Sequence, residues 1–210
     1  MFGTMNRLAS RAFTLLEILV VTVVLLGLLA LLFPVLREVD TRAKEAKAAN
    51  HFRQFGVAIT SFAMDNDGGL PLRLDSGELW PTALVGYLDG DTNIYAEPNS
   101  AVNFRTLHAD PLSNTENNTS YILNSFRDLG DRARKMVNIE KPASTILMAA
   151  QEYNPGFFMD IDRNDYLRFV RYRQYREGAY YLFGDGSAQY VASNNYDGTL
   201  WMADKSFVLQ

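Results

Sequence analysis

The most constraining feature of this chain is a long apolar stretch near its N-terminus. Residues 13–33 are dominated by Leu, Val and Ile, and Glu17 is the single charged residue among them. As a helix this stretch spans roughly 30 Å, which is enough to cross the hydrocarbon core of a bilayer. The preceding residues carry Arg7 and Arg11 and no acid, like the positive start of an export signal. The sequence therefore predicts one membrane-crossing helix behind a short basic leader.

Three interpretations compete for this stretch. A cleaved signal peptide predicts a shorter apolar region ending in a small-x-small site, whereas this region is long and ends at Phe33 and Pro34. A plain signal anchor explains the length and the hydrophobicity but not Glu17. A carboxylate inside a membrane helix costs roughly 2 to 3 kcal/mol or more unless it is paired, so such residues are usually functional. Glu17 is therefore the residue that separates the interpretations.

The third interpretation explains Glu17, because the stretch AFTLLE at residues 12–17 resembles the processing site of type IV prepilins and type II secretion pseudopilins. The resemblance implies that a prepilin peptidase cuts between Ala12 and Phe13 and that the new amino group of Phe13 is methylated. It also implies that Glu17 pairs with this amine on a neighbouring subunit, where the two charges offset each other. Pro34 matches a helix-kinking proline of many pilins. The family usually has Gly where this chain has Ala12.

Three further stretches resemble a pilin-like subfamily that ends in an Asp-Gly hairpin with the pattern His-x9-Asp-Gly. NHFRQFG at residues 50–56 resembles its NLRQxG stretch, and FAMDNDGGLP at residues 62–71 resembles its helix-ending segment. GAYYLFGDGS at residues 178–187 matches the hairpin, but Tyr175 stands at the His position and Glu177 replaces a Gly. The Asp-Gly step in itself favours a tight turn between two strands.

The predicted fold class is α+β and pilin-like, with a long N-terminal helix, transmembrane in its first half, packed on an antiparallel β-sheet head. The expected divisions are a leader at 1–12, a transmembrane or filament-core helix at 13–34, an amphipathic continuation at 35–66 and a globular head at 67–210. Apolar residues of the continuation follow a nearly helical spacing from Val35 and Val39 through Ala43 and Ala46 to Phe62. Two separate helices broken at Pro34 are the alternative. Strands are predicted at residues 120–124, 145–150, 178–183 and 187–192.

Composition argues against several kinds of chemistry. The net charge of -4 and the lack of cysteine argue against a nucleic-acid surface, thiol catalysis and cysteine-based metal sites. His51 and His108 are the only histidines, and neither has an acid or nucleophile at a recognisable spacing, so the chain is predicted not to be an enzyme. We expect His51 to be a half-buried packing residue. No cofactor is expected.

Two polar segments are weighed as binding sites. Oxygen donors alternate at Asp160, Asp162, Asn164 and Asp165, but the Gly and the bidentate Glu of an EF-hand loop are missing, so a solvated turn is favoured over calcium. Basic residues alternate with aromatic ones further on. This pattern suits a nucleic-acid or acidic partner but is more typical of a solvated strand face. The basic residues are Arg168, Arg171, Arg173 and Arg176.

The resemblance implies a structural subunit of a type IV pilus or of a type II secretion filament, a homo-oligomer. Its partners would be other pilin or pseudopilin subunits, prepilin peptidase, an inner-membrane assembly platform and membrane lipid. The subunit would cross the bacterial inner membrane once, with its head in the periplasm, before it enters a filament or reaches the cell surface. Positive charges are more numerous after the span than before it, which by simple counting favours the opposite orientation. The alternative function is a membrane-anchored extracytoplasmic binding module or enzyme that uses the helix only as a tether.

Overall fold

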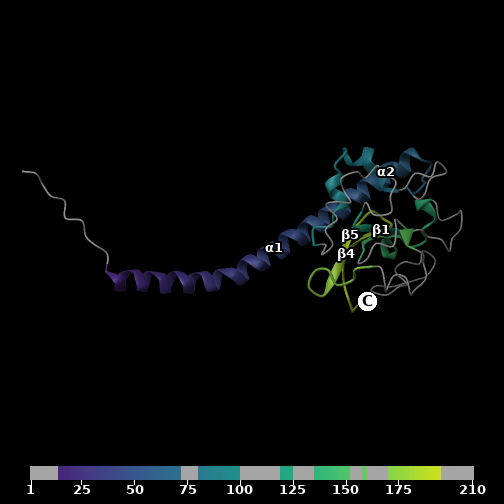
Figure 1. Cartoon of the computed structure of the whole chain (residues 1–210). Coiled ribbons are helices and arrows are strands. Elements are labelled where there is room, and N and C mark those ends of the chain that lie inside the picture. Colours follow the sequence, from purple (N-terminus) through teal and green to yellow (C-terminus); the bar gives the residue numbers. More distant parts are fainter. Residues whose placement is uncertain are drawn as a thin grey trace, which may run out of the picture. The chain divides into compact units, whose positions relative to one another are not determined.

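The computed structural model describes residues 14–71, 80–99, 119–124, 135–151, 158–159 and 170–194. Helix α1 (Leu15–Asp65) is one continuous element with Pro34 inside it, which excludes two separate helices broken at that proline. The chain divides into two compact units, Met1–Arg42 and Ala43–Gln210, and α1 contributes residues to both. The first unit contains the apolar stretch and the second contains the sheet (Figure 1).

The end of α1 follows from its sequence. Gly68 donates its backbone N–H to the carbonyl oxygen of Ala63 at 2.7 Å, as in a helix C-cap closed by a residue beyond the helix. Asp67 and Gly68 have φ angles of 54° and 78°, a left-handed conformation that Gly and Asp tolerate better than most residues. The helix therefore ends within residues 62–71, as their resemblance to a helix-ending segment implies.

The second unit is built on one sheet with the strand order β3-β1-β2-β4-β5. Strands β1 (Tyr121–Asn124), β2 (Ile146–Ala150), β4 (Gly178–Phe183) and β5 (Ala188–Ala192) pair antiparallel and confirm the four predicted strands. The two-residue strand β3 (Phe158–Met159) joins β1 in parallel and was not expected. A long apolar helix and an antiparallel sheet make the fold class α+β.

Several short helices follow α1 in the sequence, and the first of them pack against its second part. They are α2 (Trp80–Leu84), η1 (Val85–Leu88) and η2 (Thr92–Tyr95); two more 3-10 turns, η5 (Met136–Asn138) and η6 (Pro142–Ser144), precede β2. Phe55 lies at the centre of the core they form. Its ring centroid lies 5.9 Å from that of Trp80, 5.5 Å from that of Tyr95 and 5.2 Å from that of Tyr121. This aromatic cluster fixes the second part of α1 against its own unit.

The buried face of α1 corrects the predicted apolar face. Burial begins at Ala48 and follows the spacing of Phe52, Phe55, Ile59 and Phe62, whereas Ala43 and Ala46 are exposed, as are the earlier Val35, Leu36 and Val39. The two sets lie on different sides of the helix, because the step from Ala46 to Phe52 breaks the alternation of three and four residues. The predicted stripe therefore combined two faces, and the sheet covers only one of them.

The predicted hairpin is present and backs directly onto α1. Phe183 donates its N–H to the carbonyl of Ser187 at 2.9 Å, and the Asp185 side chain accepts from the N–H of Ser187 at 2.9 Å. Gly186 has a φ of 81°, which suits glycine. A Cβ atom at Gly56 would lie 2.6 Å from the carbonyl oxygen of Gly186, so only glycine fits there. Two stretches far apart in the sequence, residues 50–56 and 178–187, therefore meet at this contact.

Candidate functional site

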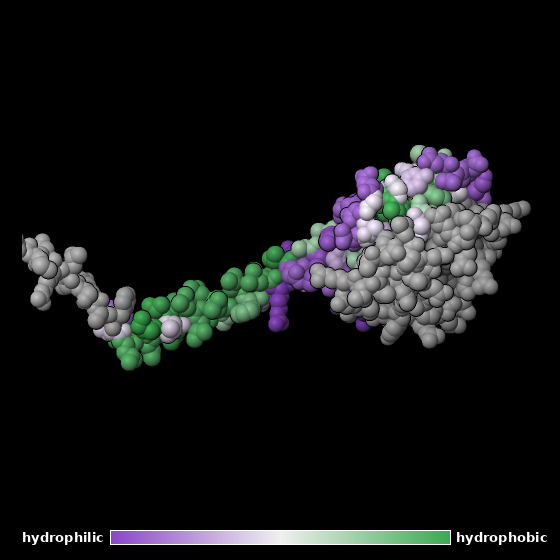
Figure 2. Space-filling view, turned by 45° about the horizontal axis from the view of Figure 1, so that its top comes forward, coloured by the Kyte–Doolittle hydropathy of each residue, from purple (hydrophilic) through white to green (hydrophobic). Residues whose placement is uncertain are grey.

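The first candidate site is the apolar part of α1. Side chains from Leu15 to Val39 are exposed within the described residues. No part of the most apolar 18-residue stretch of α1 is buried. By length and composition α1 is one helix that could cross a membrane. Figure 2 shows hydrophobic residues continuing along this part of the helix and giving way to hydrophilic ones further along it. An apolar surface of this extent is unusual for a helix that stays in water.

Glu17 takes part in a capping box at the start of α1. Its Oε2 atom accepts from the backbone N–H and the hydroxyl of Thr14, both at 2.8 Å, while Thr14 Oγ1 accepts from the N–H of Glu17 at 3.2 Å. Each residue thus satisfies a backbone donor that the first helical turn leaves unpaired. The sequence analysis missed this role, although the signal Thr-x-x-Glu is present at residues 14–17. Glu17 is therefore explained in part by its own chain.

Several predicted site residues lie outside the described residues. They are the leader with Ala12 and Phe13, the histidine His108, the calcium candidates Asp160, Asp162, Asn164 and Asp165, and Arg168. Among the residues that the structure describes, no group of three or more His, Cys, Asp or Glu side chains could hold a metal ion. Pro34 lies within α1, where it lacks the N–H that would bond to the preceding turn.

The prediction of an arginine-rich strand face is wrong for the residues of it that the structure describes. Residues 171–174 are not in a strand, and Tyr175 forms only an isolated bridge with Gly178. Arg171 donates to the carbonyl oxygen of Asn99 at 3.0 Å, and Arg173 lies 6.0 Å from the ring centre of Tyr172. Arg171 and Arg173 therefore have separate local environments, and in the described residues they do not share one strand face.

A buried polar cluster occupies the position where the resembled subfamily has histidine. The Tyr175 hydroxyl contacts the carboxylate of Glu97 and lies 3.3 Å from the carbonyl oxygen of Lys44 in α1. Glu97 is only 5% exposed, and its second oxygen accepts from the N–H of Asn99 at 2.8 Å. Burial raises the pKa of Glu97. These contacts tie the loop after η2 to the helix and give Tyr175 a structural role.

His51 is more buried than the expected half-buried residue, with 5% of its surface exposed. Its Nδ1 atom lies 3.0 Å from the hydroxyl oxygen of Tyr121 in β1. Burial, reinforced by the nearby charge of Lys47, lowers the pKa of His51 to about 4. At neutral pH His51 is thus an uncharged packing residue with one hydrogen-bond partner, and its packing role is as predicted.

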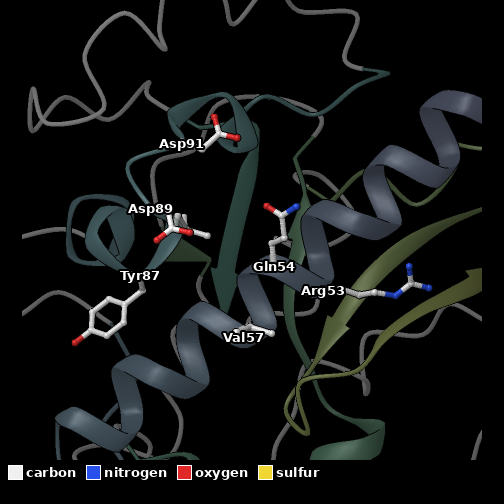
Figure 3. A pocket seen from close by; sticks show the side chains of 7 residues that line it. Arg53, Gln54, Val57, Tyr87, Asp89 and Asp91 are labelled. Carbon is white, nitrogen blue, oxygen red and sulfur yellow. The ribbon is translucent and has the colours of Figure 1, made fainter.

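An open groove of about 470 Å³ lies between the exposed side of α1 and the loop from η1 to η2. Sequence patterns did not predict it, because its two walls are distant in the chain. Its lining residues are Arg53, Gln54, Val57, Tyr87, Leu88, Asp89 and Asp91. Figure 3 shows them around the opening, with Arg53 directed away from Asp89 and Asp91. The loop side of the groove is therefore acidic, and its helix side is partly apolar.

Comparisons with known proteins add no relative. No family model matches the chain, and neither a curated protein nor a solved structure is significantly similar to it.

Proposed function

We propose that this chain is a structural subunit of a type IV pilin-like filament, of either a pilus or a type II secretion system. The observation that carries the proposal is the division of α1 into two environments. Residues before Arg42 expose apolar side chains, whereas Phe52, Phe55 and Ile59 are completely buried in the second unit. Such a helix suits a subunit whose free part is first solvated by lipid and is later packed against other subunits.

The capping box is compatible with a pairing role for Glu17. The described hydrogen bonds of its carboxylate use Oε2, so Oε1 remains for a donor from another chain. Cleavage between Ala12 and Phe13 would leave Thr14 in place, and with it the cap. The cationic amine of Phe13 on a neighbouring subunit would then meet an anion already oriented by Thr14. Fixing the carboxylate in advance lowers the entropy lost on pairing.

The contact between Gly56 and the hairpin supports the pilin-like assignment of the second unit. The two stretches that resemble the subfamily at residues 50–56 and 178–187 meet where the Gly56 backbone touches Gly186. A chance resemblance of two short stretches has no reason to place them together. Within this proposal the subunit resides in the inner membrane with its head in the periplasm, until a peptidase and an assembly platform transfer it to a filament.

Determination of the N-terminus tests the proposal most directly. Mass spectrometry of the full chain extracted from membranes should show Phe13, methylated on its amine, as the first residue. Ala12→Gly, which restores the residue usual in the family, should be processed at least as completely as the unchanged chain. An intact Met1 in assembled material would contradict the proposal.

Three substitutions then separate pairing from capping. Glu17→Gln removes the charge but keeps an acceptor at the third helical position, where Gln also serves in a capping box. Thr14→Ala removes the cap and keeps the charge. Under the filament proposal Glu17→Gln abolishes assembly in sedimented fibres while membrane insertion persists, and Thr14→Ala still assembles. Glu17→Leu, which loses both interactions, should fail like Glu17→Gln.

The capping box itself favours a second candidate, a membrane-anchored binding module or enzyme tethered by α1. In that case Glu17 needs no partner from another chain, because Thr14 and the positive end of the helix dipole already stabilise it. Glu17→Gln would then behave like the unchanged chain in every assay of membrane insertion and self-association. The same variant therefore decides between the two functions.

A further inference from the structure

We propose that Glu97 and Tyr175 form a proton-controlled latch on α1, which holds the helix backbone at Lys44 while Glu97 carries a proton and loosens when Glu97 is ionised. Lys44 follows Ala43, the first residue of the second unit. The latch therefore acts at the start of the part of α1 that belongs to this unit. The inference concerns the second unit alone and is independent of the proposed filament function.

The latch joins three segments that are far apart in the sequence. Glu97 follows η2, Tyr175 begins the turn before β4, and Lys44 lies in α1 one turn before Ala48, its first buried residue. The Tyr175 hydroxyl donates to the carboxylate of Glu97 and lies 3.3 Å from the carbonyl oxygen of Lys44. Both side chains are buried, so bulk water does not readily replace a hydrogen bond that one of them loses.

The number of hydrogens decides which of these contacts form together. A tyrosine hydroxyl has one hydrogen to donate, and an ionised carboxylate has none. When Glu97 is ionised, it takes the hydrogen of Tyr175, and the carbonyl oxygen of Lys44 receives none from this hydroxyl. When Glu97 is protonated, it donates its own hydrogen to the Tyr175 oxygen, and Tyr175 then donates to Lys44. One proton on Glu97 therefore completes a chain of two hydrogen bonds that ends on α1.

The surroundings of Glu97 make this proton available above the usual range of a carboxylate. Burial raises the pKa of Glu97, and the hydrogen bonds from Tyr175 and Asn99 lower that pKa only in part. The charge of Arg171 and the amide of Gln174 also lower the pKa of this carboxyl, and the balance still lies above the ordinary 4.5. Asn99 donates to Oε2, which leaves Oε1 beside Tyr175 to carry the proton. The latch should therefore open as the pH rises through this raised pKa.

Other ionisable groups face the latch from α1 and β1. Burial and the charge of Glu97 raise the pKa of Tyr175, with a smaller contribution from Glu45, so Tyr175 remains a hydrogen donor. Tyr121 lies 3.0 Å from Nδ1 of His51, and burial followed by the charge of Glu97 raises the pKa of Tyr121. Since His51 titrates in the opposite sense to Glu97, the test replaces it. Further groups are Lys47 and Asp91, which act on His51, and Tyr180 on β4, which contacts the Tyr175 ring.

Amide hydrogen exchange of the full chain in detergent tests the latch, because local opening of α1 exposes its backbone N–H groups. All chains carry His51→Gln and are compared between about pH 4 and 8, after correction for the intrinsic exchange rate. Residues 44–52 should lose protection about five-fold as the pH rises, as for the loss of one hydrogen bond. The ratio to exchange at residues 55–62 separates this local release from unfolding of the whole unit.

Three variants separate the latch from burial of a charge alone. Glu97→Gln donates from its amide to the Tyr175 oxygen at every pH, so residues 44–52 should keep the protection of the low-pH state throughout. Tyr175→Phe keeps the ring and breaks the link to Lys44, so protection there should be as low as in the high-pH state, or lower, and independent of pH. Glu177→Gln is the matched control, because Glu177 is exposed in the same turn, and it should leave the five-fold change intact.

A pH dependence at residues 44–52 that persists in Tyr175→Phe would overturn the proposal, because ionised Glu97 would then act on α1 without the hydroxyl. Low protection in Glu97→Gln at every pH would also overturn it, by showing that the charge and not the proton holds the helix. Fluorescence of the buried Trp80 shows whether each variant is folded. If Tyr175→Phe does not fold, the contrast between Glu97→Gln and Glu177→Gln decides, and equal pH profiles for these two would refute the latch.

Discussion

The two parts of α1 have similar hydrophobic side chains and opposite surroundings. Phe33 in the first part is 63% exposed, whereas Phe55 in the second part is completely buried between aromatic rings. The difference does not come from the residue type or from helix propensity, because both phenylalanines lie in one helix. It comes from the partner surface: α2, η2 and the sheet cover Phe55, and no described part of the chain covers Phe33. A hydrophobic helix segment without a protein partner is suited to an apolar solvent.

The largest expected effect is the difference in stability between truncations of the two phenylalanines. Phe55→Ala should lower the free energy of unfolding by about 3 to 5 kcal/mol, because it leaves a cavity inside the aromatic cluster. Phe33→Ala should change the stability of the second unit by less than about 0.5 kcal/mol, as for an exposed position. Urea unfolding of the full chain in detergent, followed by tryptophan fluorescence, measures both. Similar losses for the two variants would contradict the assigned environments.

Within α1, the buried residue His51 should make the stability of the protein depend on pH. His51 binds a proton less readily in the folded protein than in the unfolded chain, so acid favours unfolding. Stability should fall as the pH drops below about 6.5 and level off near the folded pKa of about 4, with a total loss of about 3 kcal/mol. His51→Gln, which keeps a polar partner for Tyr121, should flatten this dependence in urea titrations at several pH values.

Other groups near His51 affect the same window. Lys47 lowers the pKa of His51 and Asp91 raises it, both through their charge. Glu97 acts in the opposite sense, because its raised pKa means that stability is lost as the pH rises above its ordinary range near 4.5. The difference between the unchanged chain and His51→Gln isolates the histidine. An unchanged pH profile in the variant would show that His51 is not the group that titrates.

The two glycines of α1, Gly27 and Gly56, should show the same difference between its exposed part and its buried part. Gly56→Ala should cost about 1 to 3 kcal/mol, because the added Cβ would press on the carbonyl oxygen of Gly186 and on Leu182. Gly27→Ala meets no atom within 4 Å and should not destabilise the chain, since Ala favours helix by up to about 1 kcal/mol. Thermal unfolding in detergent distinguishes the signs. A tolerated Gly56→Ala would mean that the hairpin can move away from α1.

The smallest expected effect is at the first turn of α1. Thr14→Ala should destabilise that turn by about 1 kcal/mol through loss of the cap, which is about a five-fold faster amide exchange for the residues that follow. Thr22→Ala is the control, because Thr22 only donates its hydroxyl to the carbonyl oxygen of Leu19 within the helix. Equal exchange in both variants would remove the capping role of Thr14.

Much of the fold could be predicted from local patterns. The four antiparallel strands follow from β-branched and aromatic runs between turn residues, and the end of α1 follows from residues that tolerate left-handed backbone. The buried face of α1 could not be predicted in the same way. Two apolar rows, one through Ala43 and Ala46 and one through Phe52 and Phe55, are both compatible with a helix. Only the position of the sheet selects between them.

The candidate sites also include some features that the sequence predicts and others that only the structure shows. The apolar stretch and the Thr-x-x-Glu signal can be read locally, because a membrane span and a helix cap each depend on neighbouring residues. The acidic groove and the contact of Tyr175 with Glu97 join residues far apart in the chain, and no sequence period connects them.

By itself the sequence determined the long apolar helix, its C-terminal stop and the Asp-Gly hairpin, because the physical causes of these features act over a few residues. Tertiary structure alone decided which side of α1 is buried and why position 56 must be glycine. It also decided that the carboxylate of Glu97 is buried against Tyr175. Those outcomes depend on which surfaces meet, and that is set by packing among distant segments rather than by local preference.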